Sequence, residues 1–115
     1  MEQNFDLQKR KKGDVVILDL FGNLTVGDNE MAFKDAVAEL LSKNYNKIVV
    51  NLKDLEFMDS SGVGAIVKSF TTIQKGGGKL KLLQPSKLVR HTLKITGLLG
   101  IFEIFDEEPA AIASF

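Results

Sequence analysis

The chain has 115 residues, of which 15 are basic, 15 are acidic and 44% are hydrophobic, so it fits one folded domain with a buried core. Its balanced charge argues against nucleic acid as an obligate partner, because nucleic-acid-binding domains usually present a basic face. The sequence contains no cysteine and one histidine, His91, which excludes disulfides, thiolate chemistry and multi-histidine metal sites.

The beginning of the chain predicts an antiparallel hairpin. Residues 5–9 and 15–21 have the composition of strands, and the polar segment 10–14 between them is typical of a hairpin turn. Residues 15–21 are apolar almost without interruption rather than alternating with polar residues. That pattern indicates a strand that is covered on both faces.

The rest of the chain alternates apolar runs with helical patterns, separated by turn residues. The alternation implies parallel crossovers, and the hairpin adds antiparallel pairing, so we expect an α/β fold with a mixed sheet and about four helices packed against it. After a bend at 22–23 and a short segment at 24–26, we expect a helix capped by Asp28 or Asn29 and reaching about 44, and then a strand at 48–52. A second helix should run from the Asp59-Ser60 turn to about 74, followed by a strand at 79–83. The remaining expected elements are a helix capped by Ser86 and closed by Gly97, a short strand at 101–105, and a helix at 107–115 with Pro109 in its first turn.

The most informative segment is 57–64, Phe-Met-Asp-Ser-Ser-Gly-Val-Gly, which places Ser60 where a strand ends and a helix begins. The first turn of a helix has unpaired N–H donors and a partial positive charge. A phosphate on a serine at this position would be tolerated electrostatically. The segment therefore predicts a surface that is switched by a phosphoserine.

Simpler interpretations of the same residues also exist. Asp59 and Ser60 are both favoured as helix caps, which would give them a purely structural role. Residues 76–79, Gly-Gly-Gly-Lys, lack the spacing of a phosphate-binding loop, and His91 has no second ligand type nearby. Ser60 lacks the glycine spacing of a nucleophile elbow. We therefore expect no catalytic residue, no metal site and no enzymatic activity.

The segment 59–64, following Phe57-Met58, resembles the signature of the anti-sigma factor antagonists, a bacterial STAS-domain family. The likeness extends over nearly the whole chain and includes the opening hairpin, the helix after 22–25, the strand at 48–52 and the region 97–102. It implies a single STAS domain over residues 1–115. It also implies a cytoplasmic phosphoprotein that regulates transcription by partner switching.

In this family, the serine directly after the aspartate is phosphorylated by a partner kinase that is also the anti-sigma factor, which implies phosphorylation of Ser60. The unmodified form binds the anti-sigma factor and frees the sigma factor, the phosphorylated form does not bind, and a serine phosphatase resets the cycle. The resemblance implies no cofactor, no direct contact with nucleic acid, no membrane span, and a monomer or weak dimer. The residues expected to bind the partner beside Ser60, with small glycines for close approach and apolar side chains for contact, are Met58, Asp59, Ser61, Gly62, Val63 and Gly64.

One loop departs from the family pattern. Many relatives have a Gly-Glu-Leu-Asp type of sequence where this chain has Gly22-Asn23-Leu24-Thr25, so two carboxylates are missing from a loop implied to lie near the partner surface. Asn23 and Thr25 therefore leave the identity of the partner open. The alternative function is a scaffold or accessory STAS domain of a stress-signalling or lipid-transport complex, in which the serine turn binds a partner without phosphorylation cycling.

Overall fold

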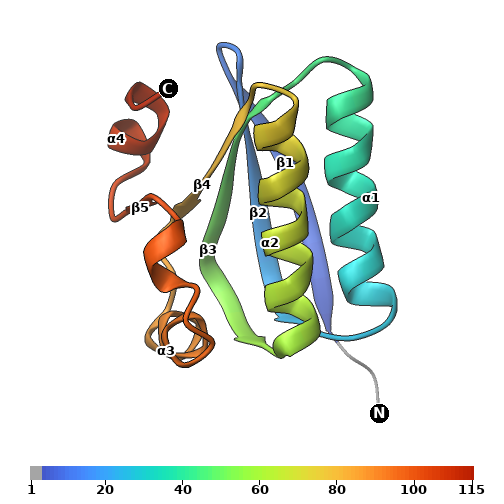
Figure 1. Cartoon of the computed structure of the whole chain (residues 1–115), viewed down its shortest axis with the longest axis vertical. Helices are drawn as coiled ribbons and strands as arrows, with labels where there is room; N and C mark the ends of the chain where they lie inside the picture. The colour runs from blue at the N-terminus through green and yellow to red at the C-terminus, as the bar shows by residue number, and fades with distance from the viewer. Residues whose placement is uncertain (1–3) are drawn as a thin grey trace.

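A five-stranded sheet with the strand order β1-β2-β3-β4-β5 forms the centre of the protein in the computed structural model, which describes residues 4–115 (Figure 1). β1 pairs antiparallel with β2, and β2 to β5 pair in parallel, as expected for a mixed α/β sheet. In chain order the elements are β1 (Phe5–Lys12), β2 (Val15–Leu24), α1 (Asp28–Ser42), β3 (Lys47–Met58), α2 (Ser60–Lys75), β4 (Lys79–Leu83), α3 (Lys87–Ile95), the 3-10 helix η1 (Leu99–Ile101), β5 (Ile104–Phe105) and α4 (Glu108–Ala113).

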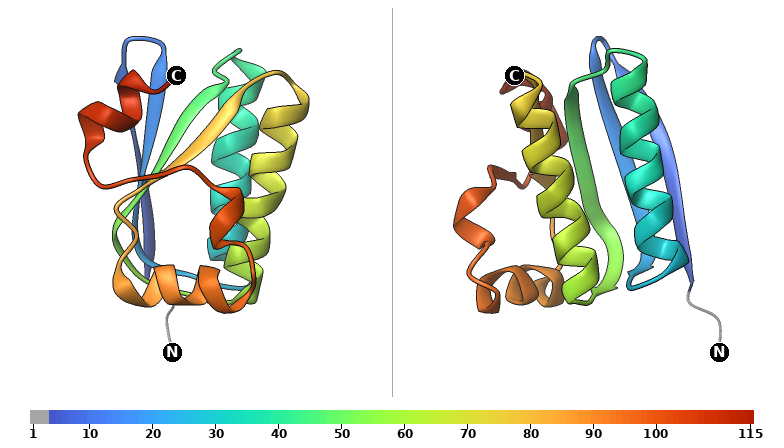
Figure 2. Two further views of the ribbon diagram at one scale, coloured as in Figure 1. Left: turned by 60° about the vertical axis from the view of Figure 1, so that its left-hand side comes forward. Right: turned by 45° about the vertical axis from the view of Figure 1, so that its right-hand side comes forward.

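The helices cover the two faces of the sheet unequally. Figure 2 shows α1 and α2 side by side on one face and α4 on the opposite face, while α3 lies near the end of the sheet where α2 begins. β2 contributes to both layers: Val16 and Leu18 belong to the main core beneath α1 and α2, and Ile17 belongs to a smaller cluster with Ala111 of α4. Burial on both faces confirms the prediction from its continuous apolar sequence.

The hairpin turn is shorter than the sequence predicts. The ladder between β1 and β2 continues to the pair Lys12↔Val15, so that only Gly13 and Asp14 form the turn. Gly13 has a φ of 64°, a conformation that glycine adopts readily. The prediction of a turn over 10–14 is therefore wrong for residues 10–12, whose charged side chains are compatible with an edge strand.

Helix caps follow the predictions in part. The side chain of Ser86 accepts a hydrogen bond from Val89 N at 3.2 Å, which confirms it as the cap of α3. The expected cap of α1 at Asp28 or Asn29 is wrong, because Gly27 occupies the N-cap position and no side chain among residues 4–115 caps this helix. Asn29 instead lies inside the helix and its amide bonds the loop before it.

The C-terminal region differs most from the expected strand at 101–105. Residues Leu99–Ile101 form a 3-10 turn, and β5 pairs only with Leu82 and Leu83. Phe102 between them is buried and packs edge-on against Phe70 of α2, with ring centroids 5.2 Å apart. Phe102, which the sequence predicts to lie in a strand, instead anchors the loop between η1 and β5 to α2. The terminal helix α4 has Pro109 in its first turn, as predicted.

Candidate partner-binding site

The serine turn is positioned by the parallel pairing of β2 with β3. β3 is longer than the predicted strand and runs to Met58, where it pairs with Leu24 at the end of β2. The loop after β2 and the turn after β3 therefore start side by side. The backbone N–H of Asp59 donates to the carbonyl of Leu24 at 3.3 Å, which joins the two segments directly.

Asp59 is the N-cap of α2, and Ser60 is its first helical residue. One carboxylate oxygen of Asp59, Oδ1, accepts a hydrogen bond from Gly62 N at 2.8 Å, which confirms the capping role. The other oxygen, Oδ2, accepts from Val26 N at 3.0 Å in the loop after β2. Ser60 is exposed, so its hydroxyl is accessible at the positively polarised end of the helix.

The two glycines of the turn have different environments. Gly64 is exposed and has open space around the position of an added Cβ, which agrees with the expected close approach of a partner. Gly62 is buried, and a Cβ there would overlap the carbonyl oxygen of Leu24 and press on the side chain of Met58. Because Gly62 has no side chain, the first turn of α2 can pack closely against Leu24 inside the domain. This corrects the predicted role of Gly62 as an open partner-binding position.

The expected apolar contacts also need correction. Met58 and Val63 are 1% and 2% exposed and belong to the main core, so their side chains offer no surface to a partner. In the loop after β2 and at the end of β3, the side chains of Val26 and Phe57 are instead exposed, at 66% and 42%, and Met31 of α1 is also exposed. Val26 carries no periodic sequence signal because it lies in a loop.

The remaining predicted site residues are partly accessible. Ser61 and Asp59 are half-buried. In the loop that departs from the family pattern, the buried Asn29 amide donates to the carbonyl of Asn23 at 3.0 Å and to the hydroxyl of Thr25 at 3.2 Å. Neutral hydrogen bonds thus hold this loop in place.

Other motifs take no part in this site. The segment 76–79 leads from α2 into β4, and Lys79 N donates to the carbonyl of Asn46 at 2.8 Å. His91 is exposed on α3. Within residues 4–115, no group of three or more His, Asp or Glu side chains is placed to hold a metal ion. No helix in the same range has the length and apolar character needed to span a membrane.

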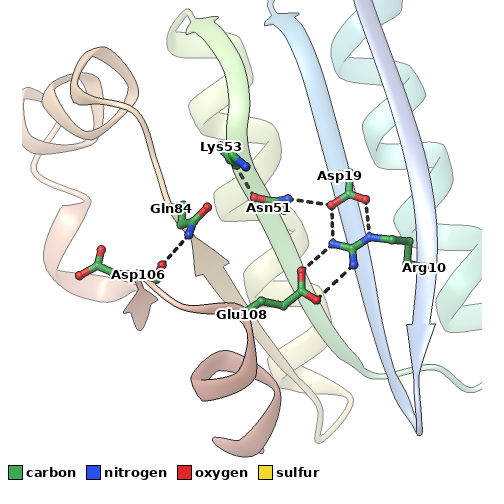
Figure 3. A network of polar contacts seen from close by, with 7 residues as sticks. All are labelled: Arg10, Asp19, Asn51, Lys53, Gln84, Asp106 and Glu108. Atoms are coloured by element: carbon green, nitrogen blue, oxygen red, sulfur yellow. Dashed lines mark hydrogen bonds and ion pairs between the residues drawn. The ribbon is translucent and has the colours of Figure 1, made fainter.

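A second polar cluster, which no sequence motif predicted, lies on the face of the sheet that α4 covers (Figure 3). Arg10 of β1 donates to both oxygens of Asp19, at 2.6 and 2.9 Å, and to both oxygens of Glu108 in α4, at 2.7 and 3.2 Å. Asn51 of β3 also donates to Asp19, at 2.8 Å. These contacts tie α4 to three strands.

The charges in this cluster shift one another's ionisation. Burial of Asp19 opposes its ionisation, but hydrogen bonds from Arg10 and Asn51 outweigh that cost and hold its pKa below the ordinary 3.8. The hydrogen bonds from Arg10 lower the pKa of Glu108 below 4.5. Hydrogen bonds to Asp19 and Glu108 in turn raise the pKa of Arg10. The cluster is therefore fully ionised at neutral pH and is a structural clamp.

Comparison with known proteins identifies the class to which this fold and serine turn belong. Residues 6–111 match the STAS domain model, and the chain belongs to the STAS domain family. This confirms the resemblance noted in the sequence.

Proteins similar to this chain include some that are named anti-sigma factor antagonists. The chain is similar to the Thermotoga maritima protein TM1081, whose solution structure matches with a TM-score of 0.83 and 36% identity over 92% of this chain and 85% of that one. It is 29% identical to the anti-sigma F factor antagonist of Paenibacillus polymyxa, over 95% of this chain and 93% of the relative. The chain is also 27% identical to the Bacillus protein SpoIIAA. The structure of its unphosphorylated form matches with a TM-score of 0.79 over 95% of this chain and 93% of that one. The structure of its phosphorylated form matches with a TM-score of 0.73 over 96% of this chain and 97% of that one.

Proposed function

We propose that this protein is an anti-sigma factor antagonist whose binding to an anti-sigma factor is abolished by phosphorylation of Ser60. The observation that carries the proposal is the exposed Ser60 hydroxyl at the first position of α2, directly after the capping Asp59. The names of the relatives support the function, and SpoIIAA, which has been solved with and without phosphate, supports the chemistry.

The physical effect of the phosphate is expected at the interface. Phosphorylation adds about −1.5 to −2 charge at neutral pH beside the Asp59 carboxylate. The helix N-terminus offsets this charge by about 0.3–1 kcal/mol, so the domain should remain folded. A partner packed over Ser60 would instead have to desolvate a dianion, at a cost of several kcal/mol if it is left unpaired.

The proposal assigns the chemistry to the partners. The domain itself is a non-enzymatic, cytoplasmic regulator without a cofactor, a monomer or weak dimer, and acts on transcription only through its protein contacts. The anti-sigma factor is a serine kinase that uses Ser60 as acceptor, and a serine phosphatase restores the free hydroxyl. Asp59, Ser61 and Gly64 lie around Ser60 with accessible surface and are proposed to contact the partner.

The test uses Ser60→Ala and Ser60→Asp, with Ser61→Ala as the matched control at the next hydroxyl. Each variant is mixed with the recombinant anti-sigma factor kinase of the same organism, and affinity and phosphate transfer are measured. We expect Ser60→Ala to bind like the wild type without accepting phosphate, Ser60→Asp to bind at least about tenfold more weakly, and Ser61→Ala to behave as wild type. Transfer of phosphate to Ser60→Ala at the wild-type level, or tight binding of Ser60→Asp, would contradict the proposal and favour a scaffold without phosphorylation cycling.

A further inference from the structure

We propose that Asp59 is a positioning residue that holds the loop 25–27 in register with Ser60, and that Val26 on this loop is covered by the same anti-sigma factor that docks on Ser60. This inference rests on the proposed function and names the two residues that would position and form the contact in the loop after β2. It assigns a binding role to Val26, which lies outside the sequence motif.

The two carboxylate oxygens of Asp59 serve two different segments. Oδ1 accepts from Gly62 N inside the first turn of α2, at 2.8 Å, whereas Oδ2 accepts from Val26 N across the gap between the two loops, at 3.0 Å. None of the hydrogen bonds that Asp59 makes within residues 4–115 involves the Ser60 side chain. Asp59 is therefore engaged in holding backbone, and we assign it no role as a base for the serine hydroxyl.

The start of α3 shows which part of this arrangement exceeds ordinary capping. There, Ser86 caps the helix by accepting from Val89 N, three residues on, with a single hydroxyl oxygen. Asp59 makes the equivalent bond to Gly62, also three residues on. Capping α2 thus needs only one acceptor, and the second oxygen of Asp59 is what links the turn to Val26.

The loop is fixed at its other end as well. Glu30 N donates to the carbonyl of Thr25 at 3.1 Å, and Met31 N donates to the carbonyl of Gly27 at 3.1 Å, which ties the loop to the first turn of α1. Val26 between these residues keeps 66% of its surface exposed although its backbone is anchored. An apolar side chain that is exposed but held in place loses little further freedom when a partner covers it.

The footprint of a partner on Ser60 would include Val26. A specific interface buries about 800 Å² on each side, which corresponds to a disc of roughly 16 Å radius. The amide of Val26 lies 3.0 Å from the side chain of the residue that precedes Ser60, well inside such a disc. Val26 is an exposed apolar side chain beside the Asp59 carboxylate and the exposed Asp28, so the surface offered there combines apolar and acidic groups.

The test compares Asp59→Ser, Val26→Ala and the double variant. Serine retains the acceptor for Gly62, as Ser86 shows, but is too short to reach Val26. Amide hydrogen exchange by NMR should show Gly62 still protected and Val26 exchanging about tenfold faster in Asp59→Ser. Isothermal titration with the recombinant anti-sigma factor kinase of the same organism should give an affinity about tenfold lower for Asp59→Ser and about fivefold lower for Val26→Ala.

The double variant decides whether the two residues act together. If Asp59 acts by placing Val26, the loss in the double variant is clearly smaller than the product of the two single losses. Ile101→Ala is the matched control, because Ile101 is also an exposed apolar residue but lies in a pocket with Gln74 and Gly78 near the far end of α2. It should bind as the wild type does.

The inference is overturned if Val26→Ala binds with wild-type affinity, if Asp59→Ser does so, or if the two losses multiply independently. Val26→Ala changes no hydrogen bond, so it decides the matter even if Asp59→Ser fails to fold. A failure here with Ser60→Asp still weakening binding would remove this inference and leave the proposed function standing. Loss of the Ser60→Asp effect would remove both.

Discussion

Gly62 in the first turn of α2 lies in direct backbone contact with the carbonyl oxygen of Leu24 at the end of β2. The same carbonyl accepts the N–H of Asp59 at 3.3 Å. The start of the helix is therefore built onto the neighbouring strand without any intervening side chain, and the position of Ser60 depends on this contact. Two glycines in the same helix allow the requirement to be tested.

We expect Gly62→Ala to destabilise the domain and Gly64→Ala to stabilise it. An added methyl group at Gly62 must push apart Leu24 and Met58, and overpacking of this kind typically costs about 1–3 kcal/mol. At Gly64 nothing lies within 4 Å of an added Cβ, so alanine should gain about 0.5–1 kcal/mol from its higher helix propensity. Urea unfolding followed by circular dichroism measures both changes.

The pair controls for helix propensity, because both substitutions add the same methyl group to the first half of α2. Equal stabilisation by the two alanines would show that the helix start can move away from β2 freely. In that case the register between the serine turn and the preceding loop is not fixed by backbone contact.

Much of the fold could be predicted because its signals are local. The continuous apolar run of β2, the cap at Ser86 and the Asp59-Ser60 turn each depend on neighbouring residues in the chain. The start of α1 could not be predicted this way. Asn29 is a favoured capping residue, but its amide bonds backward to Asn23 and Thr25 instead, and a glycine occupies the cap.

At the serine turn and in the Arg10 cluster, the features that the sequence did not predict are contacts between distant segments. The hydrogen bond from Val26 to Asp59 joins residues 33 positions apart, and that between Arg10 and Glu108 joins residues 98 positions apart. The burial of Met58 likewise depends on the extension of β3 along β2. A motif read along the chain predicts a candidate acceptor such as Ser60, but it cannot show which of its neighbours face solvent.

The Arg10 cluster should make stability depend on pH in the acid range. Its carboxylates have lowered pKa values in the folded state, so their contribution is present above their unfolded pKa values, near 3.8 for Asp19 and 4.5 for Glu108, and is lost as the pH falls further. We expect Glu108→Gln to cost about 1 kcal/mol at pH 7, a modest value because both partners are partly exposed, and close to nothing at pH 3.

Glu107→Gln is the matched control for this experiment. Glu107 precedes Glu108 in sequence, is exposed, and makes no side-chain capping bond to α4. Unfolding free energies of the wild type and both variants are compared across pH 3 to pH 7. If the two variants lose the same stability at pH 7, the effect reflects the net charge of α4 and not the ion pair with Arg10.

A different cation, Lys81, holds the C-terminal end of α4 from within β4. Its side chain is 3% exposed, and its Nζ donates at 2.9 Å to both the carbonyl and the hydroxyl of Ser114. The same Nζ lies 3.3 Å from the Glu103 carboxylate and 4.6 Å from the centroid of the Phe115 ring. A buried ammonium with this set of partners should contribute through the ring as well as through the hydrogen bonds.

We expect Phe115→Leu to cost about 1 kcal/mol in the wild type and distinctly less in a Lys81→Met background. Leucine keeps most of the apolar volume but removes the ring face that attracts the cation, an interaction worth about 0.5–2 kcal/mol. Methionine replaces the lysine with an apolar chain of similar length, so the double-mutant cycle isolates the contact between Nζ and the ring. Urea unfolding of the four proteins gives the coupling energy. An equal cost of Phe115→Leu in both backgrounds would assign the role of Phe115 to packing against the small cluster of Val15, Ile17 and Ala111 alone.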